Sequence, residues 1–197
     1  GTLATIIAGL VIARVAVHFH PAQVVSFGLA LNAAAFAVLA FLGAHSDVVI
    51  ILIFIVLGTG IGIAQTISND LMLSSVPPRK AGAASAISET SYETGAVLGT
   101  VIIGGMLTAI YRANVVIPTG LDETLSNHAH ETLGGAVTVA HHVGGEQANQ
   151  LLSSAFAAFD SGVVVSSAFS AVLMGVMAVI SYLMIRKAPR EMKPAEH

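Results

Sequence analysis

Five long apolar segments divide this sequence, and they restrict its fold more than any other feature. A helix needs about 20 mostly apolar residues to cross a bilayer, and the segments at residues 2–17, 21–43, 47–74, 81–111 and 159–185 meet or approach that length. In hydrocarbon every backbone N–H and C=O group must be paired inside the protein, and the alternating pattern of a membrane β-barrel is absent. The sequence therefore predicts an all-α polytopic membrane protein.

Composition supports this class and excludes several others. Of 197 residues, 55% are hydrophobic and 10% are charged, whereas roughly a quarter of the residues of a soluble domain are charged. The formal net charge of −3 provides no basic surface for nucleic acid. The chain has no cysteine, which removes disulfides, thiol catalysis and cysteine-bound metal. We expect no enzyme, no cofactor and no nucleic-acid partner.

Basic residues beside the spans predict the orientation. Arg14, the Arg79 and Lys80 pair and the basic tail at residues 186–197 follow alternate spans, so they share one side of the membrane. Loops that retain Lys and Arg are cytoplasmic. We therefore expect a multi-pass protein of the cytoplasmic membrane with an external amino end and a cytoplasmic carboxyl end. Because the chain begins within a span at Gly1, we also expect further transporter sequence upstream.

The segment at residues 113–158 separates the first four spans from the last. It is rich in glycine and polar residues, which predicts an external loop. Apolar residues at helical spacing predict two short amphipathic helices within it, at residues 131–143 and 146–159. The residues expected on their apolar faces are Leu133, Val137, Ala140, Leu152, Ala155, Phe156 and Phe159.

Two acidic residues in the fourth span are the strongest functional signal. Glu89 and Glu93 are four residues apart and share one helical face, beside Tyr92. Glu93 is roughly 16 Å past Gly82 along the helix, near the middle of the bilayer. An ionised carboxylate there costs about 2.5 to 3.5 kcal/mol on insertion scales. Loss of water and a like charge both favour the protonated acid, so the pair is a candidate site for binding a proton or a lipophilic cation.

Other polar residues in the spans allow more than one interpretation. The Glu pair and its Ser and Thr neighbours could instead form hydrogen bonds between packed helices. Asp70 is either a secondary proton-coupling or cation-binding residue or an interfacial acid that pairs with Arg79 or Lys80. Asn32 and Gln65 are neutral, and we expect them to pack against neighbouring helices. Tyr92 is a candidate aromatic wall for a cationic substrate.

Four histidines in the external segment are a weak signal for metal. Their spacings match no known zinc site, and adjacent histidines on a helix point about 100° apart. We therefore interpret them as solvated loop residues and expect no metal site. The residues concerned are His128, His130, His141 and His142.

Two blocks of sequence resemble a known family. Residues 75–99, SVPPRKAGAASAISETSYETGAVLG, look like the entry to the penultimate span of the fourteen-helix drug:proton antiporters of the major facilitator superfamily, of the quaternary-ammonium resistance type. Residues 131–143, ETLGGAVTVAHHV, with residues 151–162, LLSSAFAAFDSG, are similar to the helical hairpin before the last span of that family. The resemblance covers essentially the whole chain.

This resemblance implies a fold and a function. The chain would form the C-terminal five transmembrane helices of a major facilitator fold, with an external helical hairpin before the last span. The protein would export lipophilic cationic drugs in exchange for protons, and Glu89 and Glu93 occupy the places of the acids that the family uses for proton coupling or drug recognition. The alternative is a membrane scaffold that transports nothing, or a truncated fragment without activity of its own.

Overall fold

The computed structural model describes residues 19–43 and 47–186, and within these ranges the regular secondary structure is entirely helical. The elements are α2 (Pro21–Leu42), α3 (Asp47–Ser74), the 3-10 turn η2 (Pro78–Lys80), α4 (Ala81–Asn114), α5 (Glu123–Glu131), α6 (Leu133–Val143) and α7 (Gly145–Ile185). Four of them are long and apolar enough to cross a membrane: α2, α3, α7, and α4 together with η2. The all-α polytopic class is confirmed. The span expected at residues 2–17 lies outside the described residues.

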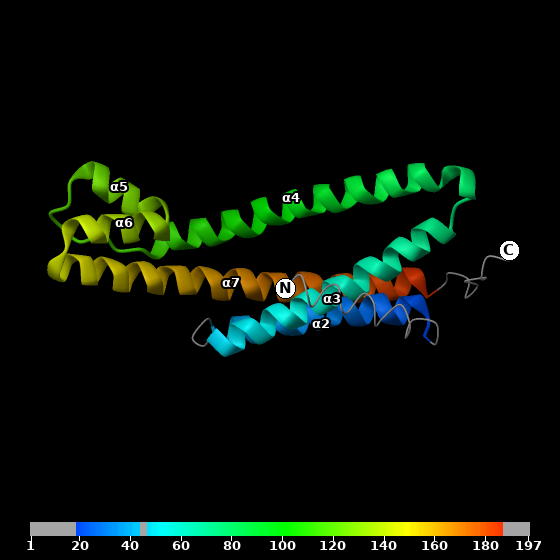
Figure 1. Ribbon diagram of the computed structural model, residues 1–197. Coiled ribbons are helices and arrows are strands. Elements are labelled where there is room, and N and C mark those ends of the chain that lie inside the picture. Colours follow the sequence, from blue (N-terminus) through cyan, green and yellow to red (C-terminus); the bar gives the residue numbers. More distant parts are fainter. Residues whose placement is uncertain (1–18, 44–46, 187–197) are drawn as a thin grey trace.

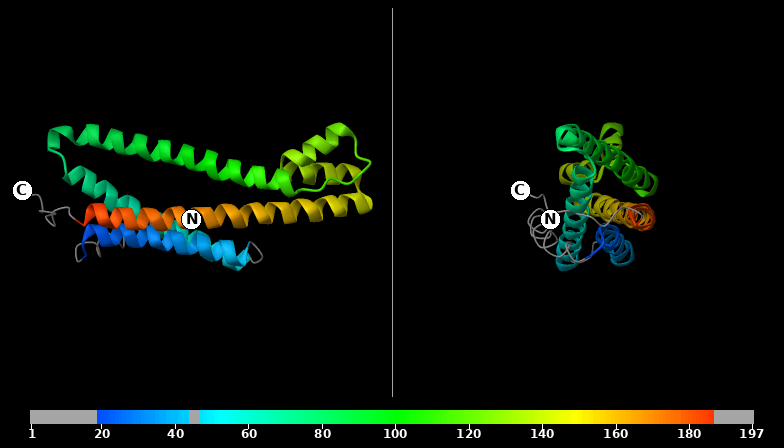
Figure 2. Two further views of the ribbon diagram at one scale, coloured as in Figure 1. Left: turned by 180° about the vertical axis from the view of Figure 1, so that it is seen from behind. Right: turned by 90° about the vertical axis from the view of Figure 1, so that its right-hand side faces the viewer.

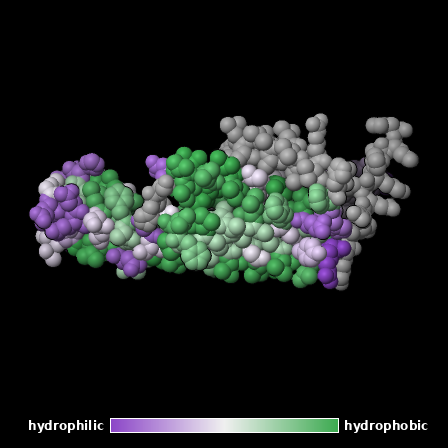
Figure 3. Space-filling view, turned by 90° about the horizontal axis from the view of Figure 1, so that it is seen from below, coloured by the Kyte–Doolittle hydropathy of each residue, from purple (hydrophilic) through white to green (hydrophobic). Residues whose placement is uncertain are grey.

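The long helices form a bundle whose two ends differ in composition. The α5–α6 hairpin stands at one end, and the turn between α3 and α4 stands at the other, beside the start of α2 and the end of α7 (Figure 1). Between these ends the surface is predominantly hydrophobic, and hydrophilic residues collect at the extremities (Figure 3). Exposed apolar residues such as Phe54 on α3 and Val172 on α7 contribute to this surface. Such a band is the surface that lipid would cover.

Helices α2 and α3 cross where two glycines allow close backbone approach. An added Cβ on Gly28 would lie 2.8 Å from the carbonyl oxygen of Gly60, and one on Gly60 would lie 2.6 Å from that of Gly28. Apolar residues on the side of the crossing toward the α3–α4 turn extend the contact: Val24, Val25, Ile63 and Ile67 form a buried cluster, against which Ile185 of α7 packs. Small residues thus bring the backbones together and larger ones fill the remaining space.

Helix α4 is the least buried of the long helices. It follows a 3-10 turn begun by Pro77 and Pro78 and runs 34 residues to Asn114. It lies close to α7 near the hairpin and diverges from it toward the Pro77–Pro78 turn, as both side views show (Figures 1 and 2). Its buried residues are Ala84, Ser88 and Tyr111. Much of the surface of α4 is therefore uncovered by the rest of the described chain.

The last helix is longer than the sequence pattern indicated. We expected a separate helix at residues 146–159 and a span beginning at residue 159, but α7 is continuous from Gly145 to Ile185. Its 41 residues make it about 60 Å long, twice the roughly 30 Å of bilayer hydrocarbon. The segment contains no proline, and one helix satisfies all of its interior backbone groups. The division at residue 159 is thus absent from the secondary structure, while the assignment of an external segment stays a prediction.

The α5–α6 hairpin is a small helical unit built on the N-terminal half of α7. Helix α6 agrees with the range expected for the first amphipathic helix, whereas α5 at Glu123–Glu131 was not expected. The buried residues of α7 here are Ala148, Leu151, Ala155 and Ala158, and Phe156, which we placed on the apolar face, is 51% exposed. The face of α7 that packs against α6 is formed mainly by small residues, which let the two helices approach closely.

Tyr111 joins this unit to the end of α4. Its side chain is 1% exposed and packs in the hairpin core with Ala129 and Leu151. Its hydroxyl donates a 2.8 Å hydrogen bond to the carbonyl oxygen of Ala129. That carbonyl lies in the last turn of α5, where the helix itself supplies no partner. Tyr111 therefore fills the hairpin core and also supplies a hydrogen-bond donor to a carbonyl in the last turn of α5.

Replacing Tyr111 by phenylalanine should loosen the hairpin. Tyr111→Phe leaves the buried Ala129 carbonyl without a donor, which costs about 1–3 kcal/mol. We expect faster amide hydrogen exchange in residues 123–143, with exchange in α2 and α3 unchanged. Tyr182→Phe is the matched control, because Tyr182 lies 41% exposed on α7. Equal exchange in both variants would contradict the role given to the hydroxyl.

Substitution by alanine should have different effects at a glycine in the α2–α3 crossing and at a glycine on α7 that has open space around it. Gly60→Ala places a Cβ against the side chain of Asn32 and the backbone of Gly28, so overpacking should lower the free energy of unfolding by about 1–3 kcal/mol. Gly175→Ala meets nothing within 4 Å, and alanine is the better helix former, so stability should be equal or higher. Thermal unfolding of the detergent-purified protein measures both; a neutral Gly60→Ala would contradict the close crossing.

Candidate functional site

The predicted acidic residues lie on α4, two to three turns after its start. Glu89 and Glu93 are both exposed, while Tyr92 between them is half-buried. Their spacing places the two carboxylates on one side of the helix. Helix α4 thus presents its acids to a side that the described chain leaves uncovered, and turns Tyr92 toward the other helices.

Hydrogen bonds around the acids stay mostly within α4. Thr90 donates to the carbonyl of Ala86 and Ser91 to that of Ile87, each at 2.8 Å. These hydroxyls are therefore engaged by their own helix. Within residues 19–43 and 47–186, neither Glu89 nor Glu93 forms an ion pair or a side-chain hydrogen bond. The carboxylates are thus left available for a proton or a cation.

One side-chain contact between α3 and α4 lies next to the acids. The hydroxyl of Ser88 donates to Oδ1 of Asn69 at 3.4 Å, and Asp70 and Glu89 are the residues that follow these two partners. Asp70 is exposed. In the part of the chain that the structure describes it pairs with neither Arg79 nor Lys80. The ion pair that we considered for Asp70 is therefore not formed here.

A cavity of about 410 Å³ lies among α2, α3, α4 and α7. It is lined by Val25, Leu29, Asn32, Ile61, Ala64, Gln65, Ser68, Tyr92, Met174 and Ser181. Tyr92, the predicted aromatic wall, is thus in the cavity lining, whereas Glu89, Glu93 and Asp70 are not. The structure therefore divides the candidate residues into two groups: Tyr92 lines an uncharged cavity, and the three acids lie outside it.

Asn32 and Gln65 line the cavity, a place that the sequence did not predict for them. We expected both to serve helix packing, and Asn32 does contact the crossing, since its side chain lies against Gly60. Both residues also line the cavity, as do Ser68 and Ser181. The only sequence signal for these cavity residues is that they are neutral and polar within apolar spans. Polar residues that pack between helices have the same pattern, so the sequence could not tell the two roles apart.

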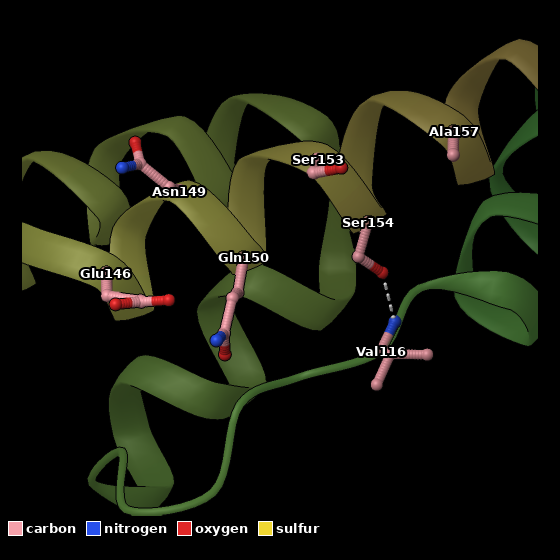
Figure 4. A pocket seen from close by; sticks show the side chains of 7 residues that line it. All are labelled: Val116, Glu146, Asn149, Gln150, Ser153, Ser154 and Ala157. Carbon is pink, nitrogen blue, oxygen red and sulfur yellow. Dashed lines mark hydrogen bonds between the residues drawn. The ribbon is translucent and has the colours of Figure 1, made fainter.

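A second hollow is an open groove of about 870 Å³ near the hairpin. Its lining consists of Val116, Glu146, Asn149, Gln150, Ser153, Ser154 and Ala157, most of them on the first turns of α7 (Figure 4). The Ser154 hydroxyl accepts a 2.7 Å hydrogen bond from the backbone N–H of Val116, which holds the chain after α4 against α7. None of the predicted site residues lies in this groove.

The four histidines of α5 and α6 do not assemble into a metal centre in the described structure. His128 and His130 lie on α5, and His141 and His142 lie near the end of α6. No group of three or more His, Asp or Glu side chains that could hold a metal ion occurs within residues 19–43 and 47–186. His142 instead bonds to the carbonyl of Thr138 at 3.0 Å.

Comparison with known proteins gives relatives by sequence, while no protein-family model matches the chain. The chain is 42% identical over 188 residues to the multidrug efflux pump LfrA of Mycolicibacterium smegmatis. It is 33% identical over 136 residues to the methyl viologen resistance protein SmvA of Salmonella typhimurium. These matches cover 95% and 68% of this chain.

The same matches cover a smaller part of the relatives. The chain spans 37% of the length of LfrA and 27% of that of SmvA. Both relatives are named for multidrug efflux or for resistance to a toxic compound. The similarity therefore connects this multi-spanning helical chain to proteins of drug efflux and resistance.

Proposed function

We propose that this chain takes part in the efflux of lipophilic cationic small molecules across the cytoplasmic membrane, driven by protons that move in the opposite direction. The observation that carries the proposal concerns Glu89 and Glu93 on α4. Among the described residues, their carboxylates have neither an ion pair nor a hydrogen bond. The similarity to LfrA, a multidrug efflux pump, and to SmvA, a methyl viologen resistance protein, supports the cationic substrate class. The protein acts as a transporter and not as an enzyme.

The roles of the acids follow from the cost of charge in a membrane. A carboxylate without a partner is expensive in hydrocarbon, and protonation or a bound cation removes most of that cost. A proton and a cationic drug that compete for the same carboxylates cannot both be bound, which couples their movements. Glu93, about one turn deeper than Glu89, is the principal coupling residue, and Asp70, near the end of α3, has a secondary role.

Tyr92 supports the same proposal from the neighbouring face of α4. A cation over the face of a tyrosine ring gains about 0.5–2 kcal/mol, most where water is excluded. Tyr92 is half-buried, whereas Glu89 and Glu93 are exposed, so a substrate near α4 finds both an aromatic surface and an acid. Transport would proceed by rocking of helical bundles in a major facilitator fold, with this chain as its C-terminal part.

The orientation is part of the proposal. Arg79, Lys80 and Arg186 stand at the end of the bundle opposite the hairpin (Figure 1). Cytoplasmic loops retain such residues, so the α3–α4 turn faces the cytoplasm and the hairpin faces outward. Helices α4 and α7 are long enough to carry the hairpin beyond the hydrocarbon.

Single cysteines test this orientation, since the chain has none of its own. An impermeant thiol reagent added to intact cells should label His130→Cys in the hairpin. It should leave Lys80→Cys unlabelled until the membrane is opened. The reverse pattern would overturn the orientation, and labelling of both residues in intact cells would contradict a spanning α4.

The coupling role predicts the behaviour of Glu93→Gln. Glutamine mimics the protonated acid, so the variant should insert at least as well as the parent, because a charge in hydrocarbon is removed. Proton-driven export of methyl viologen should fall at least tenfold. Export is measured in membrane vesicles with an imposed proton gradient, and the amount of inserted protein serves as the reference.

Proton release separates coupling from packing. Methyl viologen added to the detergent-purified protein in weak buffer should release protons, and the Glu89→Gln, Glu93→Gln double variant should release fewer. Undiminished release would refute the role of these acids. If the pair served only helix packing, as in a scaffold, either single substitution would lower thermal stability and neither would change proton release.

A further inference from the structure

The first turn of α2 obtains its hydrogen-bond acceptors from one residue, His20. The first N–H groups of a helix have no partner within it, and Pro21, at the first helical position, has no N–H to satisfy. The N–H of Ala22 donates to Nδ1 of the His20 ring at 3.2 Å. The N–H groups of Gln23 and Val24 donate to the His20 carbonyl oxygen at 2.8 and 3.3 Å. His20 therefore accepts from every N–H group at residues 22–24.

The bond to the ring fixes the protonation state of His20. A backbone N–H can only donate, so Nδ1 must carry a lone pair, and the neutral ring has its hydrogen on Nε2. A protonated imidazole has a hydrogen on both nitrogens and accepts no bond. Its positive charge would also stand at the positive end of the helix dipole. The cap on Ala22 therefore exists at the higher pH, where the ring is neutral, and is lost as the pH falls.

The donor and the acceptor of this bond differ in their access to water. Ala22 is 0% exposed, so water cannot replace the ring as acceptor unless the start of α2 shifts. His20 is half-buried and keeps part of its surface exposed, so a proton from solvent can reach it. Histidine is also the side chain whose charge ordinarily changes between pH 5 and 8. Protonation of an accessible ring would thus leave a buried N–H without a partner.

No charged group in the described residues binds the His20 ring in competition with Ala22. None of the titratable side chains near this end of the bundle forms an ion pair or a hydrogen bond with His20. They come from α3, η2 and α7, which end or begin beside the start of α2 (Figure 1): Asp70, Arg79, Lys80, Tyr182 and Arg186. The bond to Ala22 is therefore the contact of the ring that a change of pH would alter within residues 19–43 and 47–186.

The start of α2 is connected to two neighbouring helices. Val24 and Val25 belong to the buried cluster with residues of α3, and Ile185 of α7 packs against the same cluster. Gly28, one turn further along α2, makes the close backbone approach to Gly60. A shift of the first turn of α2 would therefore disturb its packing against both α3 and α7.

We propose that His20 is a pH-responsive cap, which fastens the start of α2 while its ring is neutral and releases it when the surrounding solution becomes acidic. The assignment of this end to the cytoplasm rests on the proposed function, whereas the cap itself does not. An exporter that exchanges a drug for protons brings protons to the cytoplasmic side. Release of the cap would then link the protons that accumulate there to the packing of α2, α3 and α7.

Amide hydrogen exchange of the detergent-purified protein tests the cap, with protection factors corrected for the intrinsic effect of pH. In the parent, protection of the amides at residues 22–25 should fall about tenfold between pH 7.5 and 5.5, the loss of about one hydrogen bond. His20→Asn supplies a cap that does not titrate, so protection should stay high at both pH values. His20→Ala should give low protection at both. His130→Asn, exposed on α5, is the matched control and should keep the pH dependence of the parent.

Two results would overturn the proposal: the same pH dependence in the parent and in His20→Asn, or full protection of residues 22–25 in His20→Ala at pH 7.5. His20→Ser is a second cap that does not titrate and takes the place of His20→Asn if that variant does not fold. Exchange is measured without a proton gradient. A pH-responsive cap in a protein that exports nothing would therefore contradict the proposed function and leave the cap intact, while export with no such response would overturn the cap alone.

Discussion

The pairing of backbone polar groups in a hydrocarbon environment is the constraint on which this structure depends. Lipid offers no hydrogen bonds, so each apolar segment must satisfy its own N–H and C=O groups as a helix. In α7 the unbroken helical hydrogen-bonding pattern also continues outside the apolar segment, through residues 145–158, where α6 packs against it. The hairpin is therefore built on a continuation of a spanning helix and needs no separate support.

Packing between these helices relies on small residues at a few positions. Gly28 and Gly60 bring α2 and α3 to backbone contact, and Gly162 on α7 lies against the backbone of Leu107 on α4. In lipid, where apolar surface gains little from burial, such close approaches and their dispersion contacts hold helices together. Helix α4 has few of them in its first half, where it diverges from α7 and carries its acids. The helix proposed to bind protons is thus the one least fixed by its neighbours.

The two candidate sites on α4 differ in the chemistry that they offer. Its exposed face bears Glu89 and Glu93 without ion pairs among the described residues, and Tyr92 contributes to a cavity lined only by neutral groups. A single helix thus carries two exposed acids and also contributes a tyrosine to an uncharged cavity.

Sequence alone determined the helical membrane class, the starts of three apolar helices and the position of Glu89 and Glu93 on one face of α4, because hydropathy and spacing along one helix are local properties. It did not determine that residues 146–159 continue into the last span, since an amphipathic pattern marks a buried face and not a helix end. Nor did it place Asn32 and Gln65 in a cavity, or separate Tyr92 from the two acids. Those facts depend on which face of each helix meets its neighbours. Only the tertiary structure decides that, because it sets the crossing of α2 and α3 and the direction of α4 together.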